Sequence, residues 1–234
     1  MILCIETATS VCSVALCERD KVVSVRENTE GKSHASLLTV FISGIFSELG
    51  LKASDLEAVA VSKGPGSFTG LRIGVSVAKG IAYRANIPLI GVDTLAAMFH
   101  GIAGRASEKY DLGNDPLYCP MLDARRMEVF YSVFDSSGKI LQDTGAGIID
   151  SQSFSAVSEE KKILFFGNGA GKCRDVIRRG NAVFEPGFLL SASHLRIPAY
   201  MKADAGRYED VAYFEPFYLK DFIATIPRKS ITGQ

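Results

Sequence analysis

A glycine-rich turn between an apolar strand and a helix is the first place in this sequence where chemistry could occur. A strand is predicted over residues 56–62, and it is followed by the Gly-Pro-Gly turn 64–66 and by Gly70. This layout can bind phosphate at a helix N-terminus, and Asp93 ends the next strand near the spacing of a ribose-binding acid. The glycine spacing is nevertheless GxGxxxG, and the proline of the turn has no amide proton to donate. A tight turn that leads into a close-packed helix therefore remains the alternative interpretation.

Two acidic residues stand at corresponding strand ends. Glu6 ends the first predicted strand, and Asp123 follows a strand in the second half of the chain. Such acids could flank a cleft that holds a magnesium-bound phosphate, with Thr7 and Thr9 as further nucleotide-binding candidates. Acids at strand ends are also common turn residues, so both interpretations stay open.

The other reactive side chains form no recognisable catalytic or metal-binding arrangement. None of the three histidines lies at metal-ligand spacing from another histidine or from a cysteine. The GxSxG pattern of a hydrolase nucleophile is also missing from the sequence. We therefore predict no catalytic residue and no metal site in this chain.

The order of the predicted elements indicates an α/β protein. In the first hundred residues three strands precede an alternation of helix and strand, with helices expected over residues 33–49, 69–84 and 94–104. Strands that alternate with helices favour a parallel sheet covered by helices. The second half begins in the same way, with strands over 117–122, 128–134, 139–149 and 163–166 and a helix over 170–179. The polar stretch 107–116 is the predicted boundary, which divides the chain into residues 1–106 and 107–234.

Two of the predicted helices have the composition of a protein interface. The helix over residues 33–49 has no charged residue between Lys32 and Glu48, and a surface helix normally keeps a charged face towards water. The next helix carries small residues every four positions, which lets another helix pack closely. We expect a surface that pairs with a second chain, formed by Leu37, Leu38, Phe41, Ile45, Gly70, Gly74 and Ala78. The alternatives are a central helix of a single core and a small-residue stripe that rests on the chain's own sheet.

Composition excludes several classes of protein. The 234 residues are 47% hydrophobic and 22% charged, which excludes a disordered chain, and the formal net charge of +0 argues against binding nucleic acid unaided. The five cysteines form no CxxC pair and fit reduced thiols in a cytoplasmic protein. We find neither a signal peptide nor an apolar run of membrane-spanning length.

Several segments together resemble the TsaB family, also called YeaZ. The resemblance covers nearly the whole chain, and its most specific part is the GPGSFTGLRIG sequence of residues 64–74. The other matching segments are residues 5–10, 12–16, 123–125, 167–170 and 216–220. The resemblance implies a two-subdomain actin/Hsp70/sugar-kinase-like fold, often called ASKHA, in which the second half is degenerate.

The resemblance also implies a role in a complex. TsaB proteins pair, through their first two helices, with the metal-bearing paralogue TsaD, and the ATPase TsaE joins that pair. The complex places a threonylcarbamoyl group on the adenosine beside the anticodon of certain tRNAs. By this resemblance the chain is expected to form a homodimer when alone and to meet tRNA only through the complex.

Two departures bear on catalysis. The histidines of the HxxxH metal motif of the paralogue correspond here to Thr94 and Met98, which do not serve as ligands of a hard metal. Glu6 stands where the family commonly has aspartate, which changes the geometry of any magnesium site. We predict a non-catalytic scaffold subunit without a cofactor of its own, so that ATP or ADP with magnesium would need a subunit interface. The alternative is an independent ATP-dependent kinase-like or nucleotide-binding enzyme of the same fold.

Overall fold

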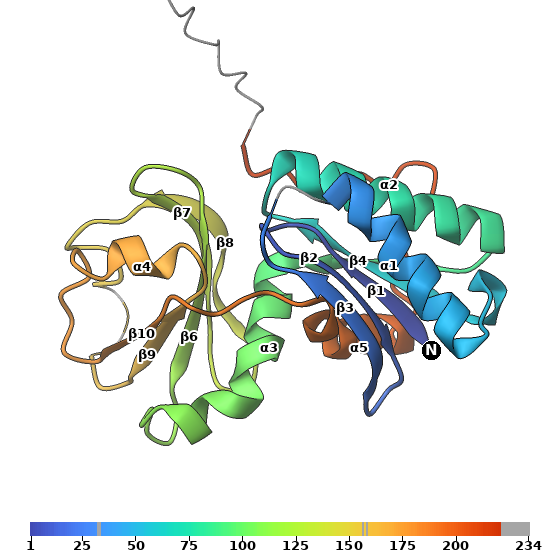
Figure 1. The fold of residues 1–234 in the computed structure, drawn as a ribbon. Coiled ribbons are helices and arrows are strands. Elements are labelled where there is room, and N and C mark those ends of the chain that lie inside the picture. The colour runs from blue at the N-terminus through green and yellow to red at the C-terminus, as the bar shows by residue number, and fades with distance from the viewer. Residues whose placement is uncertain (32–33, 156, 158, 221–234) are drawn as a thin grey trace, which may run out of the picture.

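The structure is a computed structural model that describes residues 1–31, 34–155, 157 and 159–220 (Figure 1). Two five-stranded sheets form its two halves. In the part of the chain that is described, no helix is both long and apolar enough to cross a bilayer.

The first sheet follows the predicted order of strands. Its strand order is β3-β2-β1-β4-β5, with β1, β2 and β3 antiparallel and β1, β4 and β5 parallel. The strands are β1 Ile2–Glu6, β2 Cys12–Cys17, β3 Val22–Asn28, β4 Ala58–Gly64 and β5 Leu89–Asp93. Every residue of β1 and β2 is buried, because helices cover both faces of this sheet.

Alternation along β1 assigns its side chains to two cores. Leu3 and Ile5 pack under α1 (His34–Leu49) and α2 (Phe68–Ala85) on one face. Ile2 and Cys4 pack on the other face, against α3 (Thr94–Lys109) and α5 (Arg196–Asp204). Figure 1 shows α1 and α2 together on one side of the sheet and α5 on the opposite side.

The second sheet repeats the topology of the first. Its order, β10-β9-β6-β7-β8, again places the first strand of the half at the centre, between the second and the fourth. The strands are β6 Leu117–Asp123, β7 Glu128–Phe134, β8 Ile140–Ile148, β9 Ile163–Phe166 and β10 Ala182–Glu185. This repetition confirms the duplicated α/β fold.

The second half carries much less helix than the first, as a degenerate repeat would. The helix predicted over residues 170–179 is wrong beyond its first turn, because α4 spans only Ala170–Cys173. Turn hydrogen bonds follow it, including the Ile177 amide to the Cys173 carbonyl at 2.9 Å. These turns bring Ile177 into the core beside Cys173.

Two features of the structure cross the predicted boundary after residue 106. Helix α3 continues to Lys109, past the predicted end at residue 104, because Ala106 is fully buried in the core. The short 3-10 helices are Ala53–Asp55 and Ala192–Leu195, and the second of these returns the chain to the first sheet. There the hydroxyl of Tyr200, in α5, donates to the Cys17 carbonyl at 3.1 Å. The C-terminal residues therefore complete the core of the first half.

Candidate functional site

The glycine-rich turn is shaped by close packing against the turn that follows β1. A Cβ atom at Gly66 would lie 2.5 Å from the Ala8 carbonyl oxygen, and one at Gly70 would overlap the Thr7 carbonyl. The Ser67 amide donates to the Ala8 carbonyl at 2.7 Å, so this amide is already used within the chain. The close-packed-turn interpretation therefore explains why these positions need glycine.

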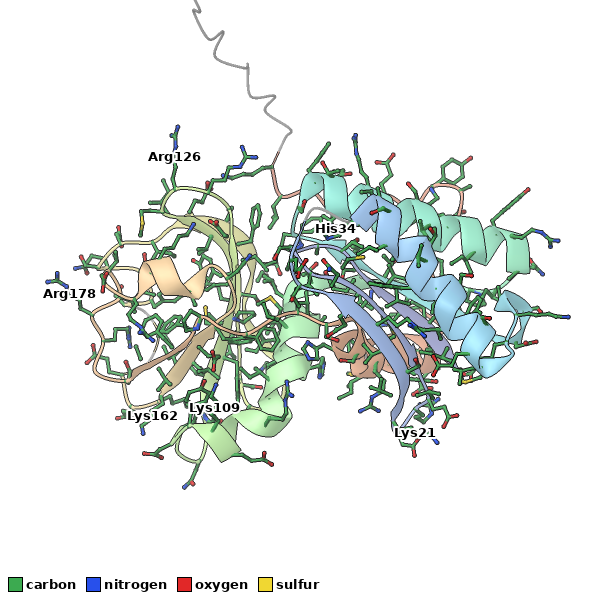
Figure 2. All side chains as sticks on the ribbon, in the orientation of Figure 1. Lys21, His34, Lys109, Arg126, Lys162 and Arg178 are labelled. Atoms are coloured by element: carbon green, nitrogen blue, oxygen red, sulfur yellow. The ribbon has the colours of Figure 1, made fainter. Side chains whose placement is uncertain are left out.

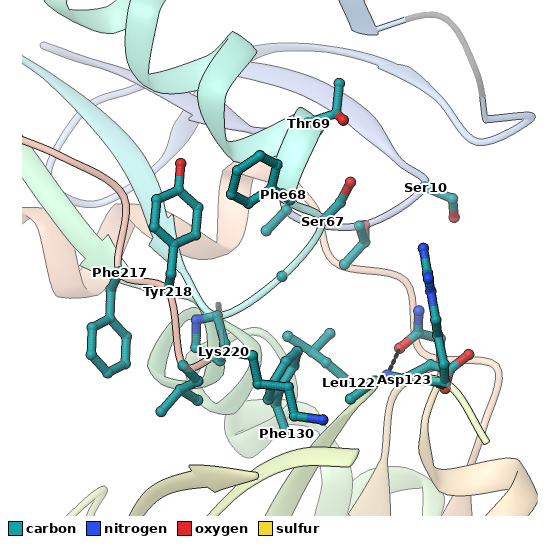
Figure 3. A pocket seen from close by; sticks show the side chains of 18 residues that line it. Ser10, Ser67, Phe68, Thr69, Leu122, Asp123, Phe130, Phe217, Tyr218 and Lys220 are labelled. Carbon is teal, nitrogen blue, oxygen red and sulfur yellow. Dashed lines mark hydrogen bonds between the residues drawn. The ribbon is translucent and has the colours of Figure 1, made fainter. Parts of the chain in front are cut away.

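A cleft of about 580 Å³ opens between the two halves at this turn (Figure 3). One wall comes from the β1–β2 turn and the N-terminal end of α2, where the Ser67 side chain caps the helix by accepting from the Gly70 amide. The opposite wall comes from the β6–β7 connection, with Phe130 and Asn168. The lining residues include Ala8, Thr9, Ser10, Phe68, Thr69, Leu122, Asp123 and Arg125.

The four predicted nucleotide-binding residues do not come together in this cleft. Thr9 and Asp123 line it, whereas Glu6 and Thr7 are fully buried behind it. The Glu6 carboxylate accepts from the Ala8 amide at 2.5 Å and from the Ser62 hydroxyl. Burial raises the pKa of Glu6 to about 7, although both hydrogen bonds act to lower it.

The acidic residue on the second wall is held by its own surroundings. The Asp123 carboxylate forms an ion pair with Lys172 and accepts from the Arg125 amide at 2.9 Å. Asn168 accepts from the Asp123 amide at 3.0 Å. With Glu6 buried and Asp123 paired, the oxygen ligands that a magnesium ion needs are not gathered here. The described residues also contain no group of three or more histidine, cysteine, aspartate or glutamate side chains placed to bind a metal.

The other residues that were considered as binding or catalytic candidates cap a helix, lie in the core or contact the start of a helix. Asp93 caps α3, with its carboxylate accepting from the Ala96 amide at 3.0 Å, and it is not among the residues that line the cleft. Thr94 and Met98 are fully buried inside the protein. His34 lies at the start of α1, where its Nε2 is 3.0 Å from the Thr9 carbonyl (Figure 2).

Sequence reasoning missed the C-terminal residues of the cleft. Residues 217–220 line it, although they lie about 150 positions after the glycine-rich turn. Only a family resemblance pointed to residues 216–220, because no local pattern indicates which distant surface a chain segment will contact.

Much of the predicted pairing surface faces the chain's own sheet. Gly70, Gly74 and Ala78 are buried, and a Cβ atom at Gly74 would overlap the Thr7 side chain. Leu38 and Ile45 of α1 are fully buried in the same core. The structure therefore agrees with the alternative interpretation of the sequence, in which the small-residue stripe packs within the chain's own first half. These five residues are buried within the chain and have no surface to offer a second chain.

An apolar surface nevertheless remains on these two helices. Leu37 and Phe41 of the predicted set are only partly buried, and Val40 is 59% exposed. A groove of about 560 Å³ runs between α1 and α2. It is lined by Thr39, Ile42, Ser43, Phe46, Ser47, Gly50, Leu51, Lys52, Val77 and Ile81. Lys52 is the only charged residue among these lining residues, so this surface suits an apolar partner.

Similarity to known proteins covers most of the chain. A family model described as "TsaD: tRNA N6-adenosine threonylcarbamoyltransferase" matches residues 26–213. The chain is 29% identical over 236 residues to "tRNA threonylcarbamoyladenosine biosynthesis protein TsaB" of Escherichia coli K12, which covers 95% of this chain and 96% of that protein. It is 33% identical over 131 residues to the Haemophilus influenzae protein of the same name, covering 56% of this chain and 52% of that one.

A comparison with solved structures shows that the fold is already known. YeaZ from Pseudomonas aeruginosa superposes with a TM-score of 0.81 at 22% identity, and the superposition covers 93% of this chain and 99% of that one.

Proposed function

Because this chain belongs to the family described as tRNA N6-adenosine threonylcarbamoyltransferase, and within it to the TsaB/YeaZ proteins, we propose that it is a non-catalytic partner subunit in tRNA threonylcarbamoyladenosine formation. Its partner is a metal-bearing paralogue of the TsaD type, and a TsaE-type ATPase joins the pair. A homodimer forms when the partner is absent. The subunit works in the cytoplasm and meets tRNA only within the complex, in keeping with its formal net charge of +0.

The observation that carries this proposal is the uncovered apolar face of α1 and α2. Both helices already pack on the first sheet through one side, yet the groove between them and the exposed Val40 remain unshielded. A second pair of helices laid into this groove would remove that apolar surface from water. The small polar side chains of Thr39, Ser43 and Ser47 would permit close approach of the partner.

The composition of the buried centre supports a role without catalysis. The positions that correspond to the histidines of the paralogue hold a hydroxyl and a thioether, and both are enclosed in the core. The Thr94 hydroxyl has no hydrogen-bond partner among the described residues.

The test is sedimentation of this chain mixed with the metal-bearing paralogue, compared with each protein alone. The critical variant is Ser43→Glu, because Ser43 is an exposed residue that lines the groove and is not among the residues of the core beneath it. A charge enclosed in an apolar interface without a partner costs about 3 kcal/mol. We therefore expect the dissociation constant to rise roughly a hundredfold.

The matched control is Ser151→Glu, which places the same charge at an exposed turn of the second half. The proposal requires a one-to-one complex that Ser43→Glu weakens and Ser151→Glu leaves unchanged. If the wild-type chain forms no complex, or if Ser43→Glu pairs as tightly as the wild type, this surface is not the pairing surface.

Nucleotide binding by this chain alone remains a second candidate, supported by the cleft between the halves. The hydroxyls of Thr9, Ser10 and Ser67 at its wall are suited to phosphate or ribose oxygens. Calorimetric titration of the isolated chain with magnesium-ATP tests it. Sub-millimolar binding that Thr9→Val weakens would favour this candidate over the scaffold role.

A further inference from the structure

The segment after α5 joins the two halves of the protein along a second route. It first pairs with the edge strand β5, where the Glu209 amide donates to the Leu89 carbonyl at 2.9 Å. It then passes along α2 and ends at the space between the two sheets (Figure 1). We call its last seven described residues, 214–220, the strap.

One side chain of α2, that of Lys79, holds the start of the strap. The Lys79 ammonium group donates to the carbonyls of Ala212 and Phe214, at 3.1 and 3.0 Å. Phe214 is only 8% exposed and lies in the core that α2 shares with the first sheet. The strap therefore begins from a fixed position.

The middle of the strap lies on the glycine-rich turn. The Phe217 amide donates to the Lys63 carbonyl at 2.6 Å. Gly64 has a φ of +122°, and the Phe217 carbonyl occupies the position that a side chain at residue 64 would take. The turn and the strap are thus fitted to each other.

Tyr218 secures the strap to the start of α2. Its ring lies 4.8 Å from that of Phe68, measured between centroids, and its hydroxyl accepts from Arg72 Nε at 3.1 Å. The Arg72 guanidinium also lies 4.0 Å from the centre of the Phe68 ring. These three side chains form one cluster, of which Phe68 and Tyr218 line the cleft.

The end of the strap crosses to the second half. Lys220 forms an ion pair with Glu128, the first residue of β7, and its side chain lines the cleft together with Phe130 (Figure 3). The strap is therefore attached to the first half at Lys63 and Arg72 and to the second half at Glu128.

We propose that the strap holds the two halves closed over the cleft, and that its release opens the cleft to a ligand. Helix α3 also joins the halves, and its ring contact between Phe99 and Phe134, 5.0 Å between centroids, lies in the continuous core. Because this core is continuous between the halves, we expect the halves to stay joined at α3 and to move about it when the strap is released. The strap link can break without exposing core, because the Lys220 and Glu128 side chains are 44% and 22% exposed. This inference does not depend on the pairing role.

The test measures the distance between the halves by double electron-electron resonance. All five native cysteines are buried, so spin labels can be directed to Gly80→Cys on α2 and Asp175→Cys in the second half. A side chain at Gly80 meets no other atom within 4 Å. The labelled chain is diluted with an excess of unlabelled wild-type chain, so that a homodimer carries only one labelled chain. Under this condition the background chain is expected to give one narrow distance distribution.

Tyr218→Ala and Lys220→Ala, each in the labelled chain, are expected to broaden the distribution and move it to longer distances. The double variant should open the cleft no further than the more open single variant, because both side chains act on the same strap. Salt at roughly 1 M, where the Debye length is about 3 Å, should shift the background chain towards Lys220→Ala and leave that variant unchanged. Tyr218→Phe keeps the ring contact and should produce a smaller shift.

Two matched controls keep the strap intact. Tyr213→Ala removes an 83% exposed ring from the same chain segment, and Lys161→Ala breaks an exposed ion pair with Asp115 inside the second half. Neither should change the distribution. The proposal is overturned if Tyr218→Ala and Lys220→Ala both retain the background distribution, or if the controls shift it equally. Circular dichroism melting of every variant establishes that the chains compared are folded.

Discussion

Replacing Glu6 with glutamine should remove a large dependence of stability on pH. Glu6 is fully buried, and the described residues place no cation beside its carboxylate. Its pKa rises from an ordinary value of 4.5 to about 7, chiefly through burial. The folded protein therefore binds the proton more tightly than the unfolded chain does.

The sign of the effect follows from this difference. A carboxyl group with a raised pKa contributes stability that is fully present below pH 4.5 and is lost as the pH rises through about 7. Between pH 5 and pH 8 the wild type should lose about 2 to 3 kcal/mol from this group. Glutamine can accept from the Ala8 amide and exchange a hydrogen bond with Ser62, and it does not titrate.

The assay is urea unfolding of both proteins at pH 5, 6, 7 and 8. Glu6→Gln should be close to the wild type at pH 5 and more stable than it by about 2 kcal/mol or more at pH 8. Glu30→Gln, at an exposed position of the same half, removes a negative charge without changing a buried group and should follow the wild type. If the free energies of unfolding of Glu6→Gln and the wild type change with pH in parallel, the argument that burial raises the pKa of the Glu6 carboxyl group is refuted.

Two further predictions concern the packing behind the cleft. Gly70→Ala should destabilise the protein by about 2 kcal/mol or more, because its Cβ would overlap the Thr7 carbonyl, whereas Gly80→Ala, on the open face of the same helix, should stabilise it by about 1 kcal/mol. Thermal and urea unfolding of the pair measure the difference, and a tolerated Gly70→Ala would mean that the β1–β2 turn can move away. Thr7→Val should be neutral or stabilising by about 1 kcal/mol, because the buried Thr7 hydroxyl has no hydrogen-bond partner among the described residues. By contrast, Ser62→Ala should cost about 2 kcal/mol at pH 8, since it removes a hydrogen bond to a buried carboxylate, and equal effects of these two substitutions would contradict the hydrogen-bond assignment.

Local sequence patterns were sufficient for most of the fold because they report local physics. Runs of apolar and β-branched residues predicted the buried strands, and Asp93, expected near the start of a helix, caps α3. The same patterns could not say what each apolar face meets. A stripe such as Gly70, Gly74 and Ala78 allows close approach, but its spacing is identical whether a partner helix or the chain's own β1–β2 turn makes that approach.

The candidate site shows the same limit at longer range. The contact between Phe217 and Lys63 joins residues more than 150 positions apart, and the resemblance of residues 216–220 to a family pattern carried no information about where they lie. Such contacts depend on the whole path of the chain, which returns from the second half through α5 before it reaches the cleft.

Glu6 and Asp123 illustrate how a duplicated fold can give two equivalent positions different properties. Each ends the central strand of its sheet, β1 in one half and β6 in the other. The Glu6 side chain folds back to the Ala8 amide and the Ser62 hydroxyl, and it is fully buried. Asp123 points to the cleft, where its side chain is 48% exposed and paired with Lys172. Two carboxylates that the sequence placed at matching strand ends therefore cannot bind one cation together: one is enclosed in the core with a raised pKa, and the other is already neutralised by a lysine. This asymmetry, rather than an absence of acidic residues, is the physical reason why these two carboxylates do not form a shared magnesium site in the cleft.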